Sequence, residues 1–254
     1  MISYRVIPVL LLSEGALVKT EKFKKPIYVG DPINAIRIFN DKEVDELIFL
    51  DIDASKSNRG PDFALLEQIA SECFMPFGYG GGITTLEQIK RIYSTGIEKV
   101  ILNSVVFDKP ELVEAAAAEA GSQSVVVSID YKKALLGITK VYSHAKRKTP
   151  SKSVVELAKE IESRGAGELI LNSVDQDGKM NGYDLDMIAA ISEALTIPVV
   201  ACGGAGGIGH LSDAIEKGKA SAVAAGSMFV FHGPHKAVLI NYPSQQKLST
   251  IFIQ

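Results

Sequence analysis

The stretch ELIFLDID at residues 46–53 returns as ELILNSVD at residues 168–175, which lies 122 residues further along the chain. The same offset continues without a gap and aligns glycines, prolines and phenylalanines. The matched pairs include Gly60 with Gly182, Pro76 with Pro198, Gly81 with Gly203, Gly96 with Gly218 and Phe107 with Phe229. Self-similarity at a fixed offset indicates a fold made of repeated units. We therefore predict two similar halves, at about residues 1–122 and 123–240.

Short apolar runs rich in Ile and Val alternate with segments of helical period along the whole chain. Eight strands are expected, at residues 4–11, 46–51, 75–79, 99–102, 124–130, 168–172, 198–202 and 220–225. Helices are expected between them, at residues 61–73, 85–95, 110–120, 153–164, 184–195 and 210–217. Apolar strands that alternate with helices are typical of a parallel sheet covered on both faces, and eight such units close into a barrel. We predict a single (β/α)8 TIM barrel over residues 1–254, with a twofold half-barrel repeat.

The bulk composition narrows the function classes. A hydrophobic fraction of 46% is enough for a substantial core. The net charge is only −3 and the basic residues are spread along the chain, which makes nucleic acid a poor candidate partner but leaves a small anionic substrate open. The apolar run at the N-terminus is too short to cross a membrane. Neither the two cysteines, Cys73 and Cys202, nor the four histidines follow a metal-ligand spacing. We expect a cytoplasmic protein without disulfides, metal or cofactor.

Two segments are long for connections between a strand and the next helix. They are residues 13–31 and 131–150, and both are rich in Lys. Both follow the carboxyl end of a strand, on the face where TIM barrels carry their active sites, so we expect lids over a substrate. The alternative is that they are hairpins without a function. Residues 229–254 are expected to form an irregular tail with a short helix, to which the sequence assigns no role.

Glycine runs follow two strands at equivalent places of the repeat. They are residues 80–82 and 203–207, and the neighbouring strands end in polar or small residues. A glycine run at a strand end leaves backbone N–H groups free to bind an anion, and a following helix adds its dipole. We predict two phosphate sites, one in each half. Their candidate residues are Gly81, Gly82, Asn103, Ser104, Gly203, Gly204, Gly226 and Ser227. The alternative is that the glycines serve tight turns alone.

Carboxylates also gather at the carboxyl ends of the predicted strands. They are Asp51, Asp53, Asp130, Asp175 and Asp177. Such residues act as general acids or bases, or hold a ligand hydroxyl or amine, although each of them also suits a helix cap. Asp130 ends an otherwise apolar strand, so we expect it to point into the barrel mouth with a raised tendency to bind a proton. It is the preferred catalytic candidate.

A different set of charges lies at the opposite, amino-terminal ends of the strands. The set is Arg5, Glu46, Lys99 and Glu168. Alternating charges on different strands are able to form a ring of ion pairs across the barrel floor. The alternative is that they are solvated strand ends, which contribute little to stability.

Taken together, these motifs resemble the cyclase subunit of imidazole glycerol phosphate synthase over essentially the whole chain to about residue 235. The motifs that carry the resemblance are FLDIDAS at 49–55, GGGI at 80–83, VVSID at 126–130, NSVDQDG at 172–178, GYD at 182–184 and GGAG at 203–206. The resemblance implies that a glutaminase docks on the barrel floor. Ammonia then passes up the barrel and is joined to a bisphosphorylated ribulosyl substrate with lyase cleavage.

The same resemblance assigns roles to individual residues. It implies that the four floor charges gate the ammonia path, that Glu98 belongs to the docking surface and that Lys19 belongs to a mobile first loop. One phosphate site would be formed by Gly82, Asn103 and Ser104. The other would be formed by Asp177, Gly178, Gly204 and Gly226.

The chain departs from this family at two positions. The family uses an aspartate at the end of strand 1 together with one at the end of strand 5, and Asp130 matches the second while Leu11 stands at the first. Leucine cannot transfer a proton, and a positioned proton-transfer group is worth about two or more decades of rate. Gly226 stands where a hydroxyl residue is usual in one phosphate site, although Ser227 follows.

These departures make the chain more similar to a paralogous branch of the family that is associated with acetamidino modification of bacterial surface sugars. The shared stretches are VGDP at 29–32, IFN at 38–40, SECFMP at 71–76, FVFHGPH at 229–235 and AVLINYP at 237–243. This branch implies a barrel that passes ammonia from a glutaminase to a separate sugar amidotransferase. An active cyclase of histidine biosynthesis and a scaffold that only stabilises the glutaminase stay open as alternatives.

Overall fold

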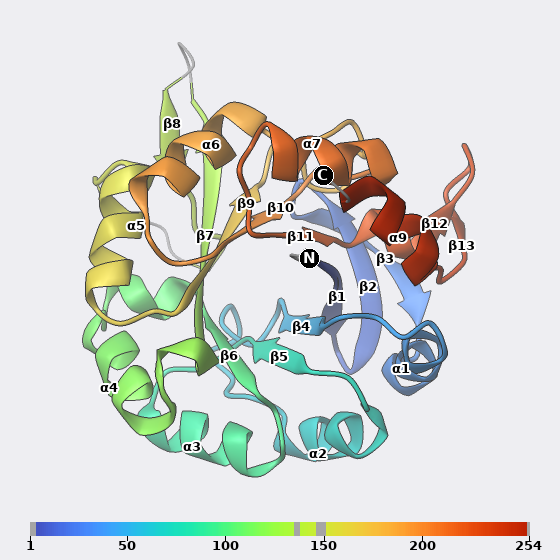
Figure 1. The fold of residues 1–254 in the computed structure, drawn as a ribbon. Helices are drawn as coiled ribbons and strands as arrows, with labels where there is room; N and C mark the ends of the chain where they lie inside the picture. The colour runs from blue at the N-terminus through green and yellow to red at the C-terminus, as the bar shows by residue number, and fades with distance from the viewer. Residues whose placement is uncertain (1–3, 135–137, 146–150, 253–254) are drawn as a thin grey trace.

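A computed structural model describes residues 4–134, 138–145 and 151–252 of the chain. Eight parallel strands form a closed barrel, because the last of them pairs with the first (Figure 1). In order around the barrel they are β1 (Arg5–Ser13), β4 (Leu47–Asp51), β5 (Phe77–Gly80), β6 (Lys99–Leu102), β7 (Val125–Lys133), β9 (Glu168–Ser173), β10 (Val199–Cys202) and β11 (Ala222–Ala225). The predicted (β/α)8 barrel is confirmed.

The strands are buried on both faces. On β1 the side chains of Leu10 and Leu12 point outward into the large core beneath the helices, whereas those of Ile7, Val9 and Leu11 point into the barrel. Successive side chains of a strand point to opposite faces, so a strand between two packed layers has no polar face. This explains why the apolar runs in the sequence are continuous and do not alternate.

Helices surround the barrel (Figure 1). They are α1 (Pro32–Asp41), α2 (Phe63–Glu72), α3 (Leu86–Ser94), α4 (Glu111–Ala120), α5 (Val154–Ser163), α6 (Leu185–Ala194), α7 (Ile208–Glu216) and α8 (Ser227–Val230), with short 3₁₀ turns at η1 (Ser104–Phe107) and η2 (Ser122–Ser124). Thr85 and Ser153 begin α3 and α5 with complete capping boxes. The six expected helices are present within a few residues of their predicted ends.

The two long insertions form β-structure at the mouth of the barrel. The first is a hairpin of β2 (Ala16–Glu21) and β3 (Lys24–Gly30), and β2 pairs antiparallel with the end of β1. In the second, β8 (Thr139–Val141) pairs antiparallel with the extended end of β7. Residues 135–137 and 146–150 of the expected second lid lie outside the described residues.

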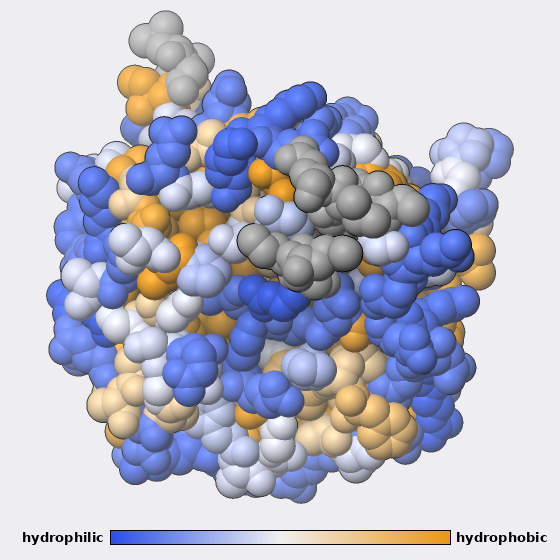
Figure 2. All heavy atoms as spheres, in the orientation of Figure 1, coloured by the Kyte–Doolittle hydropathy of each residue, from blue (hydrophilic) through white to orange (hydrophobic). Residues whose placement is uncertain are grey.

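The C-terminal tail is more regular than expected. It contains a small hairpin of β12 (Phe231–His232) and β13 (Ala237–Val238), followed by α9 (Gln245–Phe252) beside α7. Figures 1 and 2 view the molecule from the end where the N-terminus and α9 lie, and Figure 2 shows that polar side chains cover much of this end between apolar patches. None of the helices among the described residues is long and apolar enough to span a membrane.

Candidate functional site

A pocket opens at the carboxyl ends of the barrel strands, and most of the predicted site residues line it. These are Leu11, Lys19, Asp51, Gly81, Gly82, Asn103, Ser104, Asp130, Asp177, Gly178, Gly203, Gly204, Gly226 and Ser227. Asp175 is not among the lining residues, and its carboxylate instead accepts a hydrogen bond from the backbone N–H of Lys133 at 2.8 Å. Asp53 accepts from the Ser13 hydroxyl at 2.5 Å. Their contacts therefore support the loops around the pocket.

Asp130 lies on β7 and lines the pocket, and it is only 8% exposed. Each carboxylate oxygen accepts one side-chain amide: Oδ2 from Asn103 at 3.0 Å and Oδ1 from Asn172 at 2.9 Å. Burial raises the pKa of Asp130, and the nearby charge of Asp177 adds to this rise, whereas the hydrogen bonds from the side-chain amides of Asn172 and Asn103 lower it. The net result is a pKa of about 6. This is the range of a carboxyl that exchanges a proton near neutral pH.

Asn172 also lines the pocket and holds Asp130, a role that the sequence patterns did not assign to it. It lies on β9 directly opposite Asp130 in the strand register. Its Oδ1 is buried and accepts no hydrogen bond within the described part of the chain. Its position in the sequence could have predicted this role. Because β7 and β9 are neighbours in the barrel, inward-pointing residues near their carboxyl ends lie side by side.

The three carboxylates that line the pocket have different partners. Asp51 pairs with the guanidinium of Arg59 at 2.9 Å, and Asp177 pairs with the ammonium of Lys19 at 2.8 Å. Asp130 differs from the other two in that its described partners are all neutral donors, with no cation among them. Leu11 lines the same pocket at 9% exposure and packs into the apolar interior of the barrel. The pocket therefore carries one carboxylate suited to proton transfer and an alkyl group at the end of β1.

The glycine runs that follow β5 and β10 are under the same kind of constraint, positive φ and no room for a Cβ. Gly82 (φ +67°) and Gly204 (φ +123°) both have left-handed backbone, and a Cβ would lie 2.4 Å from Arg59 O in the first and 2.1 Å from Gly182 O in the second. Only glycine fits such positions. These constraints explain the glycines as turn residues. The buried hydroxyl of Ser227, which has no hydrogen-bond partner within the described residues, adds a group that is free to bind a ligand at the second run.

Lys19 lies on β2, and its side chain is buried between Asp177 and Gly226. Besides the ion pair with Lys19, Asp177 accepts a hydrogen bond from the hydroxyl of Thr20 at 3.3 Å, and the N–H of Lys22 donates to the Asp177 carbonyl at 3.1 Å. A Cβ at residue 226 would lie 3.0 Å from Lys19 Cε, so Gly226 provides the space for this side chain. The first insertion, in which Lys19 was expected to belong to a mobile loop, is a hairpin whose residues Lys19, Thr20 and Phe23 line the pocket.

The two insertions meet over the pocket through aromatic side chains. The ring of Phe23 lies 6.0 Å from that of Tyr142 and 6.1 Å from that of His144, and the latter pair is edge-to-face. Phe23 and His144 both line the pocket. Burial lowers the pKa of His144, and the positive charges of Lys56 and Lys132 lower it further. The two insertions are therefore in contact with each other over the pocket.

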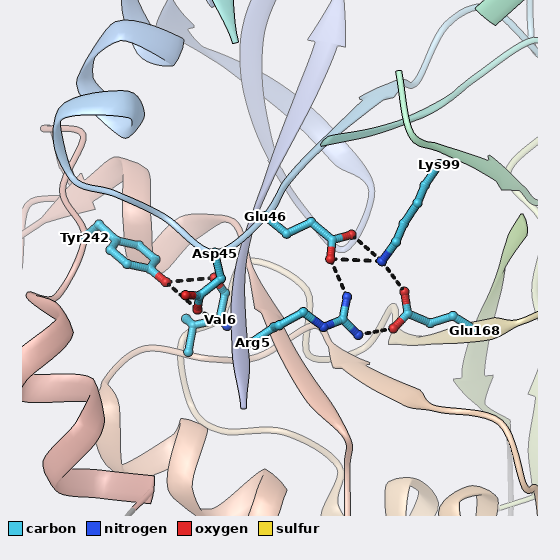
Figure 3. A network of polar contacts seen from close by, with 7 residues as sticks. All are labelled: Arg5, Val6, Asp45, Glu46, Lys99, Glu168 and Tyr242. Carbon is cyan, nitrogen blue, oxygen red and sulfur yellow. Dashed lines mark hydrogen bonds and ion pairs between the residues drawn. The ribbon is translucent and has the colours of Figure 1, made fainter. Parts of the chain in front are cut away.

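The four charges at the other end of the barrel form a closed ring, which we call the floor ring: Arg5, Glu46, Lys99 and Glu168 (Figure 3). Arg5 hydrogen-bonds both glutamates, and Lys99 Nζ lies 2.9 Å from Glu46 Oε1 and 2.9 Å from Glu168 Oε2. Glu46 and Glu168 are 3% and 5% exposed, which excludes the alternative of solvated strand ends. Glu98, next to Lys99, is exposed.

Electrostatics stabilise the ring in its charged form. Burial raises the pKa of Glu168, but the hydrogen bond and charge of Arg5 and the charge of Lys99 outweigh it, so the pKa lies below its ordinary value. For Arg5, burial lowers the pKa, but the two glutamates outweigh this effect and the net shift is upward. Two buried glutamates and two partly buried cations thus satisfy one another in a closed network at the floor.

The interior between the floor ring and the pocket is apolar. It is filled by side chains from all but one of the barrel strands: Ile7, Ile48, Ile101, Val126, Ile170, Val200, Ala222 and Ala224. An apolar interior admits a small neutral molecule at much lower free-energy cost than an ion. No cluster of His, Cys, Asp and Glu suited to a metal ion occurs within residues 4–134, 138–145 and 151–252.

Comparisons with known proteins agree with this geometry. The family described as histidine biosynthesis protein matches residues 5–235. A Pseudomonas aeruginosa protein provisionally named imidazole glycerol phosphate synthase subunit hisF2 is 52% identical over 248 residues, covering 98% of this chain and 99% of the relative. A Vibrio vulnificus protein with the provisional name subunit hisF3 is 49% identical, with 96% and 94% covered. A Leptospira interrogans protein provisionally named subunit HisF is 47% identical, with 99% and 100% covered. The chain belongs to the histidine biosynthesis protein family, among relatives named as HisF subunits of imidazole glycerol phosphate synthase.

Proposed function

We propose that this chain is a cytoplasmic barrel subunit that receives ammonia from a glutaminase and supplies it for the conversion of an acetamido to an acetamidino group on a bacterial surface sugar. The observation that carries the proposal is a contrast between the two ends of the barrel. The floor ring is complete, whereas the pocket has Asp130 at one of the family's two acid/base positions and Leu11 at the other.

The floor end suits an ammonia entrance. The glutaminase docks there beside Glu98, and neutral ammonia enters between the side chains of the floor ring. The apolar interior then favours ammonia over ammonium, because an ion loses its hydration without compensation there. The floor ring suits both a barrel that consumes ammonia and one that passes it on. Only the residues of the pocket can therefore discriminate between these two functions.

The pocket end suits transfer better than cyclisation. Ring closure on a bisphosphorylated ribulosyl substrate needs an acid and a base on opposite sides, and removal of one commonly costs about two decades of rate or more. Lys19 also occupies space beside Gly226 and is neutralised by Asp177. We propose that the two glycine runs bind phosphates of a ligand and that the pocket mouth faces a separate sugar amidotransferase.

A second candidate function is an active cyclase of histidine biosynthesis. Asp130, held by Asn103 and Asn172, retains one well-positioned proton-transfer group, and both glycine runs are intact. The experiment that decides is a cyclase assay of the purified protein with an ammonium salt and the bisphosphorylated formimino-ribulosyl substrate, next to a Leu11→Asp variant. Turnover by the unmodified protein would restore the histidine role. Absence of turnover with retained substrate binding, and a gain in Leu11→Asp, supports the ammonia-transfer role.

A variant with a blocked barrel interior discriminates between a barrel that conducts ammonia and a non-catalytic scaffold. Ala224 points into the barrel and is 0% exposed, whereas its neighbour Val223 is 0% exposed and points outward beneath the helices. Ala224→Phe blocks the interior, while Val223→Phe overpacks the outer core at a similar cost in stability. We expect transfer of the glutamine amide nitrogen to be lost only in Ala224→Phe, with glutaminase binding retained in both. Equal transfer in both variants would identify a scaffold.

A further inference from the structure

The C-terminal tail reaches the barrel floor through one buried tyrosine (Figure 3). The hydroxyl of Tyr242 lies 2.9 Å from the carbonyl oxygen of Val6 and 3.3 Å from Oδ2 of Asp45. The side chain is buried, and its ring packs on that of Phe229 with centroids 5.3 Å apart. A phenol in this position is fixed at both ends, by its ring and by its hydroxyl.

These contacts lie next to the floor ring in the sequence. Val6 follows Arg5 and Asp45 precedes Glu46, so the Tyr242 hydroxyl touches both segments that carry the Arg5–Glu46 ion pair. Asp45 closes the network, because its Oδ2 also accepts from the N–H of Val6 at 2.9 Å. One carboxylate and one phenol therefore tie the start of β1 to the turn before β4.

The sheet itself does not provide this tie. The pairing of β1 with β4 begins only at Val9 and Ile48, whereas the start of β1 pairs on its other side, where Arg5 lies opposite Ala222 on β11. At the level of the floor ring, β1 and β4 are therefore not paired through their backbones. The relative position of Arg5 and Glu46 depends on the contacts of Asp45 and the tail.

A second tail residue supports the same segment. Nε2 of Gln245, at the start of α9, lies 2.7 Å from the carbonyl oxygen of Glu43 and 3.4 Å from Oδ1 of Asp45. Both tail contacts thus converge on the turn that leads into Glu46. Ion-pair energies in a buried cluster fall off as the charges separate, so a small shift of this turn weakens the contact of Arg5 with Glu46.

We propose that Tyr242 is a positioning residue of the floor ring, which holds β1 and β4 in the register that keeps the ring closed. The role of the ring as an ammonia entrance rests on the proposed function, whereas the mechanical role of Tyr242 does not. The tail, which the sequence left without a role, thereby becomes part of the floor at which a glutaminase would dock.

The test measures the opening of the ring directly, by the rate at which a small water-soluble acylating reagent modifies Lys99. The modified peptide is quantified by mass spectrometry and normalised to the exposed Lys42. Tyr242→Phe keeps the ring packing and removes the hydroxyl. Tyr183→Phe is the matched control, because the buried hydroxyl of Tyr183 also donates to a backbone carbonyl, that of Ala224 at 2.9 Å. Gln245→Ala, at an exposed residue, weakens the other tail contact.

We expect Tyr242→Phe to raise the relative labelling rate of Lys99 about fivefold, which corresponds to the loss of one buried neutral hydrogen bond. Gln245→Ala is expected to raise it less, and Tyr183→Phe to leave it unchanged. Equal rates in Tyr242→Phe and Tyr183→Phe overturn the inference, whatever the glutaminase assay gives. A selective rise in Tyr242→Phe supports it even if the unmodified barrel stimulates no glutaminase, an outcome that refutes only the proposed function.

Discussion

The side-chain amide of Asn172 donates to Oδ1 of Asp130 over 2.9 Å, between two residues that lie directly opposite each other on β7 and β9. Asn103, which directly follows β6, donates to the other oxygen. The carboxylate is thus held from both sides by neutral donors, which favour its ionised form, in a buried position that disfavours it. The effect of burial is larger than that of the two hydrogen bonds, so the pKa is raised to about 6.

The raised pKa of Asp130 makes the stability of the protein depend on pH. Because the folded-state pKa is about 6 and the ordinary value is 3.8, the folded protein binds a proton between about pH 6 and pH 4 that the unfolded chain releases. The contribution of Asp130 to the free energy of unfolding therefore rises as the pH falls through this window, by up to about 3 kcal/mol. Urea unfolding of the unmodified protein and of Asp130→Asn at pH 7 and pH 4 checks this. A difference between the two proteins that stays constant with pH contradicts the buried, raised pKa.

Removal of the Asn172 amide is expected to raise the pKa of Asp130 further. Asn172→Leu keeps the approximate volume and deletes a donor that stabilises the charged carboxylate, so the pKa moves upward from about 6. A ¹³C NMR titration of the aspartate carboxyl signals measures the shift. Asn34→Leu is a control on the exposed start of α1, where Asn34 contributes only its backbone N–H to Asp31. An unchanged or lower pKa in Asn172→Leu would show that the amide does not act on Asp130.

Because Lys19 packs beside Gly226, we predict that substitutions at residues 226 and 19 have coupled effects on the free energy of unfolding. In Gly226→Ala the new Cβ would meet Lys19 Cε at 3.0 Å and Val9 O at 3.1 Å, so the side chain of Lys19 has to shift by a few tenths of an ångström, which disturbs its contact with Asp177. We expect a loss of about 1–3 kcal/mol in the free energy of unfolding. The loss should shrink when Lys19→Ala is present, because the clash with the side chain is gone. Strictly additive effects in this double-mutant cycle would place Lys19 elsewhere in solution.

The sequence predicted the barrel because its signals are local or periodic. The repeat from Glu46 to Glu168 and the apolar strands both follow from the packing of strands between two layers, which leaves a pattern in any single chain. The floor charges were found for the same reason. Their position at strand starts is visible in the sequence, and strand order then brings them together.

The contacts between distant segments could not be predicted. Lys19 was expected in a mobile first loop, but the burial of its side chain depends on one partner, Asp177, and on the space that Gly226 leaves. The role of Tyr242 depends on where the tail crosses the floor. Neither relationship has a fixed spacing or period, because side chains from separate elements meet only after the barrel has closed.

The floor ring is expected to cost far more stability when broken than a surface ion pair. Arg5→Met removes the partner of two buried glutamates, and loss of one partner from a buried ion pair destabilises by about 3–5 kcal/mol. Arg37→Met is the control, since Arg37 pairs with Glu72 at an exposed site on α1 and should cost about 1 kcal/mol or less. The deficit of Arg5→Met should also shrink on acidification. Arg5 holds the pKa of Glu168 below its ordinary value, so the stability that it provides is present above that ordinary value and is lost as the pH falls through the lowered one. Urea unfolding of the unmodified protein and both variants at pH 7 and pH 4 measures these differences. Equal losses in Arg5→Met and Arg37→Met at pH 7 would mean that the floor ring is hydrated and open.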